Sequence, residues 1–216
     1  MRRAPLTAGV IVGSIRPRDV KKAIASGADL LEIRVDTYSA RDPETIEHAL
    51  RALKGIRKPL ILTIRSTKEG GRFYISDKKR LELFNALAPY AGYVDIELSS
   101  NTILKSVVDL TKRLGKKLII SYHNFRETPG KKELAGIVKK GVSLGADVVK
   151  IVCRTNDAGD LKRLASLLID YDGLTVIGMG DYGKVSRILF PALGSKITYG
   201  SITKASAPGQ MSVAEI

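Results

Sequence analysis

Two residues whose side chains could carry out a reaction stand on successive apolar runs of the chain. Lys150 lies within GADVVKIVC, residues 145–153, where seven of the nine residues are apolar or glycine. A lysine buried in such a run loses hydration, so it must either pair with an anion or release its proton and become a nucleophile. His123 ends the preceding apolar run. An amine and an imidazole on neighbouring strands could perform imine chemistry with a built-in proton carrier.

The elements that must position this pair are strands alternating with helices. Eight short runs rich in Val, Ile and Leu predict strands that are buried on both faces. They cover residues 9–15, 29–36, 58–66, 93–99, 117–123, 147–153, 174–180 and 196–202. The segments between them have apolar residues at three- and four-residue spacing, and several end in glycine, as helices do. Together they predict a single catalytic domain over residues 1–216, an α/β protein with a parallel (β/α)8 TIM barrel; a doubly wound open sheet is the alternative.

Polar residues gather near the predicted C-terminal ends of these strands, where a barrel carries its chemistry. Alternation places Glu32, Arg34 and Asp36 on one face of the second run, and Ser121 with His123 on the fifth. Thr63 and Arg65 share a face of the third run. We therefore expect a polar pocket above an apolar barrel interior.

Three further stretches supply candidate ligand contacts. Glu69 precedes two glycines, which let the backbone approach a ligand closely. Arg187 opens the helix after the seventh strand and offers a planar fork suited to a carboxylate. The segment KASAPGQM, residues 204–211, is small and flexible enough for a lid. Ordinary structural roles remain open for these residues. Lys150 could extend outward between helices, and His123 could be a hydrogen-bonded residue at a strand end. The loop after Glu69 could be an ordinary turn, and Arg187 could be a solvated helix residue.

Composition excludes several other classes. Cys153 is the single cysteine, which excludes internal disulfides. It is three positions after Lys150 and so points to the opposite face of the strand, where we expect it in the core facing the helices. His48 falls among charges on a predicted helix, and we expect it on the surface; no metal-ligand spacing is recognisable. The net charge of +14 is scattered without interleaved aromatics, which favours attraction of a small anion over nucleic-acid binding. No apolar run is long enough for a membrane helix, and the start of the chain fits a first strand better than a signal peptide.

Six short motifs in order resemble the type I 3-dehydroquinate dehydratases, the Schiff-base enzymes of the shikimate pathway. They are EIRVD, TIRSTKEGG, SYHNF, GADVVKI, SRI and ASAPGQMSV, and the resemblance extends from the first strand to the end of the chain. The resemblance implies a lyase of aromatic amino acid biosynthesis, with 3-dehydroquinate as its small-molecule substrate. Another class I Schiff-base enzyme of the aldolase type is the alternative.

The resemblance also implies roles for individual residues. Lys150 corresponds to the lysine that forms the imine, and His123 to the general acid and base. Arg187 corresponds to the arginine that holds the substrate carboxylate. The remaining substrate-binding positions implied by the resemblance are Glu32, Arg34, Arg65, Glu69, Ser206 and Gln210. Such a reaction requires neither a metal nor an organic cofactor, because the protonated imine is itself the electron sink.

The chain also departs from the family pattern. It begins at its first strand, without the N-terminal hairpin of larger members, and MSVAEI, residues 211–216, is too short for a full last helix. Tyr199 stands where an aromatic residue, often Phe, is found, which makes that pocket wall more polar. We expect the eighth strand to be incompletely covered and a homodimer partner to cover it, or the native polypeptide to continue. The expected location is the cytoplasm.

Overall fold

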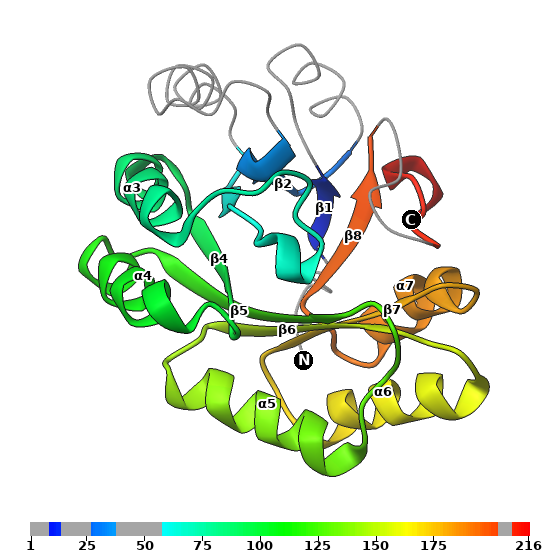
Figure 1. Ribbon diagram of the computed structural model, residues 1–216. Helices are drawn as coiled ribbons and strands as arrows, with labels where there is room; N and C mark the ends of the chain where they lie inside the picture. Colours follow the sequence, from blue (N-terminus) through cyan, green and yellow to red (C-terminus); the bar gives the residue numbers. More distant parts are fainter. Residues whose placement is uncertain (1–8, 14–26, 38–57, 203–208) are drawn as a thin grey trace, which may run out of the picture.

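Eight parallel strands form one curled sheet in the computed structural model, which describes residues 9–13, 27–37, 58–202 and 209–216 (Figure 1). The hydrogen-bonded order is β7-β6-β5-β4-β3-β2-β1-β8, so the first and last strands of the chain are neighbours. The strands are β1 (Gly9–Gly13), β2 (Leu30–Arg34), β3 (Leu60–Thr63), β4 (Tyr93–Glu97), β5 (Lys117–Asn124), β6 (Val148–Arg154), β7 (Leu174–Met179) and β8 (Ile197–Ser201). At the seam between β7 and β8, the backbone N–H of Lys196 donates to the carbonyl of Leu174 at 2.8 Å. The predicted parallel barrel is thus confirmed.

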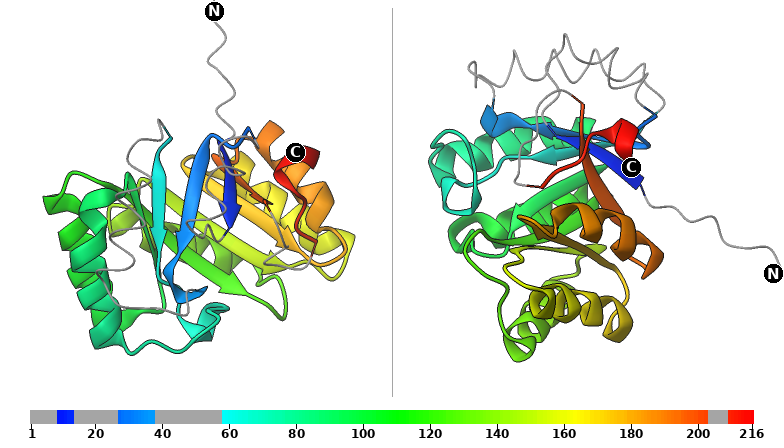
Figure 2. Two further views of the ribbon diagram at one scale, coloured as in Figure 1. Left: turned by 90° about the horizontal axis from the view of Figure 1, so that it is seen from above. Right: turned by 90° about the vertical axis from the view of Figure 1, so that its right-hand side faces the viewer.

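The described helices lie outside the sheet (Figure 2). They are α3 (Asp77–Leu87), α4 (Asn101–Arg113), α5 (Lys131–Ser143), α6 (Ala158–Asp170) and α7 (Gly183–Ala192). Of these, α4 to α7 pack against the outer faces of β4 to β8. The helix predicted around His48 lies outside the described residues. Within the described part of the chain, no helix combines the length and apolar character that crossing a bilayer requires.

Local sequence explains where these elements begin and end. Asp157 accepts a hydrogen bond from the backbone N–H of Asp160 and so caps the start of α6. Gly115 and Gly145 follow the ends of α4 and α5 with φ angles of 61° and 84°, a conformation that costs glycine little. The glycine stops read from the sequence are therefore the turns that return the chain to β5 and β6.

Two apolar regions support the barrel. Outward residues of the strands pack against the helices, and Cys153 lies fully buried among them, as its position on the strand predicted. Burial raises the pKa of its thiol to about 12, so it is a core residue and not a thiolate nucleophile near neutral pH. The barrel interior is filled by inward residues that include Leu30, Ile61, Ile119, Val148 and Ile197. This apolar plug is the floor of the site described below.

The end of the chain differs from expectation. All five residues of β8 are buried, and a Cβ on Gly200 would lie 3.0 Å from Val213 of the 3-10 helix η5 (Val213–Glu215). The backbone N–H of Ser201 donates to the carbonyl of Met211 at 2.9 Å. The expectation that β8 would lack cover is therefore wrong, because residues 211–213 pack against it. Large exposed apolar side chains lie instead on α7, namely Val185, Ile188 and Leu189.

Candidate active site

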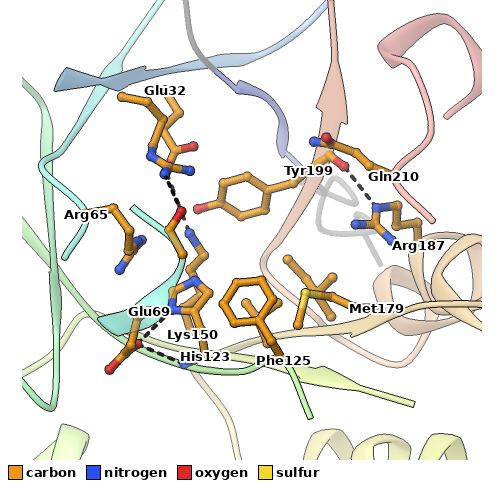
Figure 3. A pocket seen from close by; sticks show the side chains of 14 residues that line it. Glu32, Arg65, Glu69, His123, Phe125, Lys150, Met179, Arg187, Tyr199 and Gln210 are labelled. Atoms are coloured by element: carbon orange, nitrogen blue, oxygen red, sulfur yellow. Dashed lines mark hydrogen bonds and ion pairs between the residues drawn. The ribbon is translucent and has the colours of Figure 1, made fainter. Parts of the chain in front are cut away.

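A pocket opens at the C-terminal ends of the strands and collects nearly all of the predicted site residues (Figure 3). Its polar lining is Glu32, Arg34, Arg65, Glu69, His123, Lys150, Arg187, Tyr199 and Gln210, and its apolar lining includes Phe125, Val152, Ile177 and Met179. Ser206 lies outside the described residues, so its placement stays a prediction. The pocket joins a charged wall from β2 to β6 with a more apolar wall from β7 and β8.

Lys150 lies at the base of this pocket with only 4% of its surface exposed. Its Nζ is 3.0 Å from Oδ2 of Asp95 and 3.7 Å from Oε1 of Glu32. The same nitrogen lies 4.1 Å from the centroid of the Tyr199 ring. Of the two routes by which a buried lysine can persist, the structure shows pairing with anions.

Asp95 of β4 is the central acceptor of the site and was not singled out from the sequence. Both of its carboxylate oxygens accept from Nη2 of Arg65, at 2.9 and 3.0 Å, and Oδ1 also accepts from Ser121 Oγ at 2.7 Å. Burial alone would raise the pKa of the Asp95 carboxyl, but the positive charges of Arg65 and Lys150 hold it far below its usual range. Period-two alternation in YVDIELS places Asp95 on the inward face of its strand, and this pattern could have identified it as a site residue.

Glu32 and Arg65 complete the charged wall next to Lys150. Glu32 accepts a hydrogen bond from Thr63 Oγ1 at 2.8 Å, which orients its carboxylate between β2 and β3. Arg65 donates from Nη1 to Ser121 Oγ at 2.6 Å and lies 3.3 Å from Oε1 of Glu97. The guanidinium of Arg65 is therefore occupied by protein groups and holds Asp95 in place.

His123 and Glu69 form a second buried pair beside the lysine. One carboxylate oxygen of Glu69, Oε2, lies 2.9 Å from His123 Nδ1 and accepts from the His123 backbone N–H at 2.9 Å. The other oxygen accepts from Ser99 Oγ. Burial raises the pKa of Glu69 to about 7, although Ser99 and Arg65 act in the opposite direction. An ionised Glu69 fixes the proton of His123 on Nδ1 and leaves Nε2 as an acceptor.

The pKa of His123 is lowered well below its usual value. Burial is the largest cause, and the positive charges of Arg65 and Lys150 add to it. A neutral imidazole can accept a proton, so the resting state of His123 is that of a base. The site therefore holds the side-chain nitrogen of Lys150 and a neutral imidazole in one pocket, and Lys150 is almost fully buried there.

A network behind the pocket holds the loop that carries Glu69. This loop is the 3-10 helix η3 (Thr67–Glu69), which follows β3. Glu97 accepts from the backbone N–H of Ser66 at 2.7 Å and pairs with Nη2 of Arg80, a residue of α3 that is 1% exposed. A Cβ on Gly71 would come within 2.3 Å of the Arg65 carbonyl, so only glycine fits where the loop leaves η3.

Arg34 is anchored by the residue two positions later. Asp36, in the 3-10 helix η2 (Val35–Thr37), accepts from Nε and Nη2 of Arg34, both at 2.8 Å. Asp36 also accepts from the backbone N–H groups of Arg65 and Arg72. Alternation predicted that Asp36 shares a strand face with Arg34. In the structure β2 ends at Arg34, and Asp36 lies after the strand, where it accepts hydrogen bonds from Arg34 and from the loop after β3.

Arg187 lies on the opposite side of the pocket and is 3% exposed. It donates to the backbone carbonyls of Tyr199, Gly178, Gly183 and Gly209 at 2.7–3.2 Å, and it forms no ion pair with a described residue. Burial lowers its pKa to about 10. An arginine held rigidly without a protein counter-charge is suited to an anionic ligand.

The structure combines a parallel barrel, a buried lysine, a histidine–carboxylate pair and a cluster of charges at the strand ends. This combination is typical of enzymes that bind a carbonyl substrate as an imine. The sequence profile described as type I 3-dehydroquinase matches residues 16–216 of this chain. The chain therefore belongs to the type I 3-dehydroquinase family, which decides against the aldolase-type alternative.

Individual relatives agree with this assignment. The 3-dehydroquinate dehydratase of Aquifex aeolicus is 42% identical over 199 residues, covering 92% of this chain and 89% of that protein. The 3-dehydroquinate dehydratase of Pyrococcus abyssi is 39% identical over 212 residues, covering 98% and 95%. The crystal structure of the Aquifex aeolicus enzyme superposes with a TM-score of 0.87 at 39% identity, covering 96% of this chain and 94% of that one. The similarity spans nearly the whole of each chain, so it includes both the barrel strands and the loops that carry the site residues.

Proposed function

We propose that this chain is a lyase that dehydrates 3-dehydroquinate to 3-dehydroshikimate and water, a step of the shikimate pathway, and that Lys150 forms the imine. The observation that carries the proposal is the amine of Lys150 at the base of the pocket, 3.0 Å from Asp95 and next to the pair of His123 and Glu69. Family membership supports the reaction, and this geometry supports the role proposed for Lys150.

The chemistry follows from the electron demand of each step. The ammonium of Lys150, which is paired with Asp95, releases a proton so that its amine can add to the ketone carbon. The same proton returns to the hydroxyl of the adduct, and loss of one water gives a protonated imine. This cation makes the protons of the adjacent CH2 acidic, and Nε2 of His123 removes one to form an enamine. The enamine electrons expel the hydroxyl on the next carbon, which takes the proton from His123 and leaves as water. Addition of water to the imine then releases the product and the free lysine.

Asp95 has a defined part in this sequence of steps. The protonated imine is a cation at the position of Nζ, and Asp95 is the carboxylate nearest to that atom. Because the pKa of Asp95 is held so low, the carboxylate remains ionised throughout the reaction. It therefore stabilises the imine without taking its proton.

Binding of the substrate is divided between the two walls. Arg187 holds the substrate carboxylate with help from Gln210 and Ser206, whereas Glu32 and Arg34 face the substrate hydroxyls. Support comes from the rigid, uncompensated guanidinium of Arg187 and from the place of Gln210 in the same lining. Arg65 contributes through Asp95, whose two oxygens it holds.

The assembly of the protein is also part of the proposal. Residues 1–216 act as one catalytic barrel domain in the cytoplasm, and two copies form a homodimer. The support for the dimer is an apolar stripe on α7, where Val185, Ile188 and Leu189 are 45%, 65% and 41% exposed at helical spacing. A second copy of the chain would bury this exposed apolar helix face against its own equivalent.

The test of the activity is turnover of 3-dehydroquinate by the wild type and by Lys150→Met. Dehydration conjugates the ketone with the new double bond, so the product is followed by its ultraviolet absorbance. We expect steady turnover by the wild type and none above background by the variant, which keeps the shape of the side chain but has no amine. Turnover retained by Lys150→Met would remove the proposed mechanism.

A further inference from the structure

The hydroxyl of Tyr199 is a buried polar group that no described residue satisfies. Tyr199 lies on β8 and is 6% exposed, yet its Oη has no hydrogen-bond partner among the described residues. Two other buried side-chain atoms in the described ranges share this property, Arg163 Nε and Thr175 Oγ1. Of these three residues, Tyr199 is the one that lines the pocket. An unpaired hydroxyl destabilises a folded protein, so its position next to the reactive lysine calls for a functional explanation.

The surroundings of the ring determine what this hydroxyl can bind. Nζ of Lys150 lies 4.1 Å from the ring centroid. The hydroxyl end points toward Glu32 and Lys150 and away from Arg187 (Figure 3). Burial, with the negative charges of Glu32 and Asp95, raises the pKa of the phenol well above its usual value. The group is therefore a protonated phenol that can donate a hydrogen bond to a ligand.

The substrate presents an acceptor at this place. In 3-dehydroquinate the ketone carbon has two neighbours: a CH2 that leads to the carboxylate carbon, and a carbon that bears a hydroxyl on the opposite side. With the carboxylate at Arg187 and the ketone carbon bonded to Nζ, that hydroxyl projects toward Glu32. This is also the direction in which Oη of Tyr199 points.

We infer that Oη of Tyr199 donates a hydrogen bond to the substrate hydroxyl beside the imine carbon, and that Tyr199 is a substrate-binding, specificity-determining residue. The inference rests on the proposed function and adds a contact to it. It also explains the unpaired group, because the partner of Oη arrives with the substrate. A ring without the hydroxyl would fill the same space and still contact Lys150.

The test uses Tyr199→Phe with two substrates: 3-dehydroquinate and its analogue that lacks the hydroxyl beside the ketone. We expect Y199F to lower kcat/KM for 3-dehydroquinate roughly three- to tenfold, mainly through KM, as loss of one neutral hydrogen bond predicts. The same variant should turn over the deoxy analogue as the wild type does. Its melting temperature should equal or exceed that of the wild type, because a buried unpaired hydroxyl has been removed.

Thr175→Val is the matched control, since it also removes a buried unpaired hydroxyl but from a residue outside the pocket lining. It should leave KM unchanged for both substrates. Equal losses by Y199F on both substrates, no loss on either, or failure of Y199F to fold would each overturn the inference. An inactive wild type would remove the proposed function and this inference with it, whereas an active wild type with an unchanged Y199F removes the inference alone.

Discussion

Replacing Glu69 by glutamine tests the histidine–carboxylate pair in detail. Glutamine keeps the shape of the side chain, so its amide oxygen can still face His123 while its amide nitrogen faces Ser99 Oγ. What is lost is the negative charge 2.9 Å from Nδ1. A hydrogen bond to a charged group is worth about 1.5–3 kcal/mol against about 0.5–1.5 for a neutral one. We therefore expect a loss of about 1–2 kcal/mol when His123 becomes cationic, or roughly a five- to thirtyfold fall in kcat.

The pH profile of the wild type gives the same test a second readout. The pKa of Glu69 is raised to about 7, so its charge, and with it kcat, should rise as the pH increases through neutrality. In Glu69→Gln this rise of kcat with pH should be absent. The kcat values of wild type and variant should converge at pH values below the pKa of Glu69. The assay is kcat against pH with saturating 3-dehydroquinate.

Stability of the same variant separates charge from misfolding. A carboxyl whose pKa is raised by folding stabilises the protein below its unfolded pKa and loses that contribution as the pH rises through the folded value. The melting temperature of Glu69→Gln relative to the wild type should therefore rise as the pH increases toward about 7, and the difference should level off above that pH. An unchanged rise of kcat with pH in the variant, or a kcat within twofold of the wild type, would refute the role given to this pair.

Three further predictions concern the proton carrier, the carboxylate site and the assembly. His123→Ala should lower turnover by about 10²–10⁴-fold while the imine still forms, measured by steady-state rates and trapping; a rate within tenfold of the wild type would reject His123 as the proton carrier. Arg187→Ala should raise KM roughly ten- to hundredfold, as loss of a charge-assisted bond predicts, and an unchanged KM in a folded variant would exclude a substrate contact. Light scattering should show a dimer that Ile188→Glu on α7 converts to a monomer, whereas Ile169→Glu on α6 should not; a monomeric wild type would contradict the dimer.

Period-two alternation predicted the sides of the strands well. Lys150 shares the barrel interior with Val148 and Val152, and Cys153 faces the helices, as their positions in GADVVKIVC indicated. This information is local, because successive residues of a strand point to opposite faces whatever the partner strand is. The strand order followed from the repeated βα units, and the motifs identified most of the residues lining the pocket.

Contacts between distant segments could not be read in the same way. Lys150 and Asp95 are separated by 55 positions, and their approach depends on the register of three strands. The sequence therefore left open whether the lysine is paired. Arg187 shows a similar limit: its helix pattern suggested a carboxylate ligand but not the bond to the carbonyl of Gly209, 22 positions away. Both cases require the closed barrel, which places the ends of different units side by side.

The central claim is that Lys150 forms the imine with the substrate. Sodium borohydride reduces an imine to a stable secondary amine, so the protein is mixed with 3-dehydroquinate, treated with borohydride, digested and analysed by mass spectrometry. We expect loss of activity and ligand mass on the peptide that contains Lys150, and no such mass in wild-type protein treated with borohydride without substrate. Ligand mass on another lysine, or none in a sample that turns over 3-dehydroquinate, would contradict it.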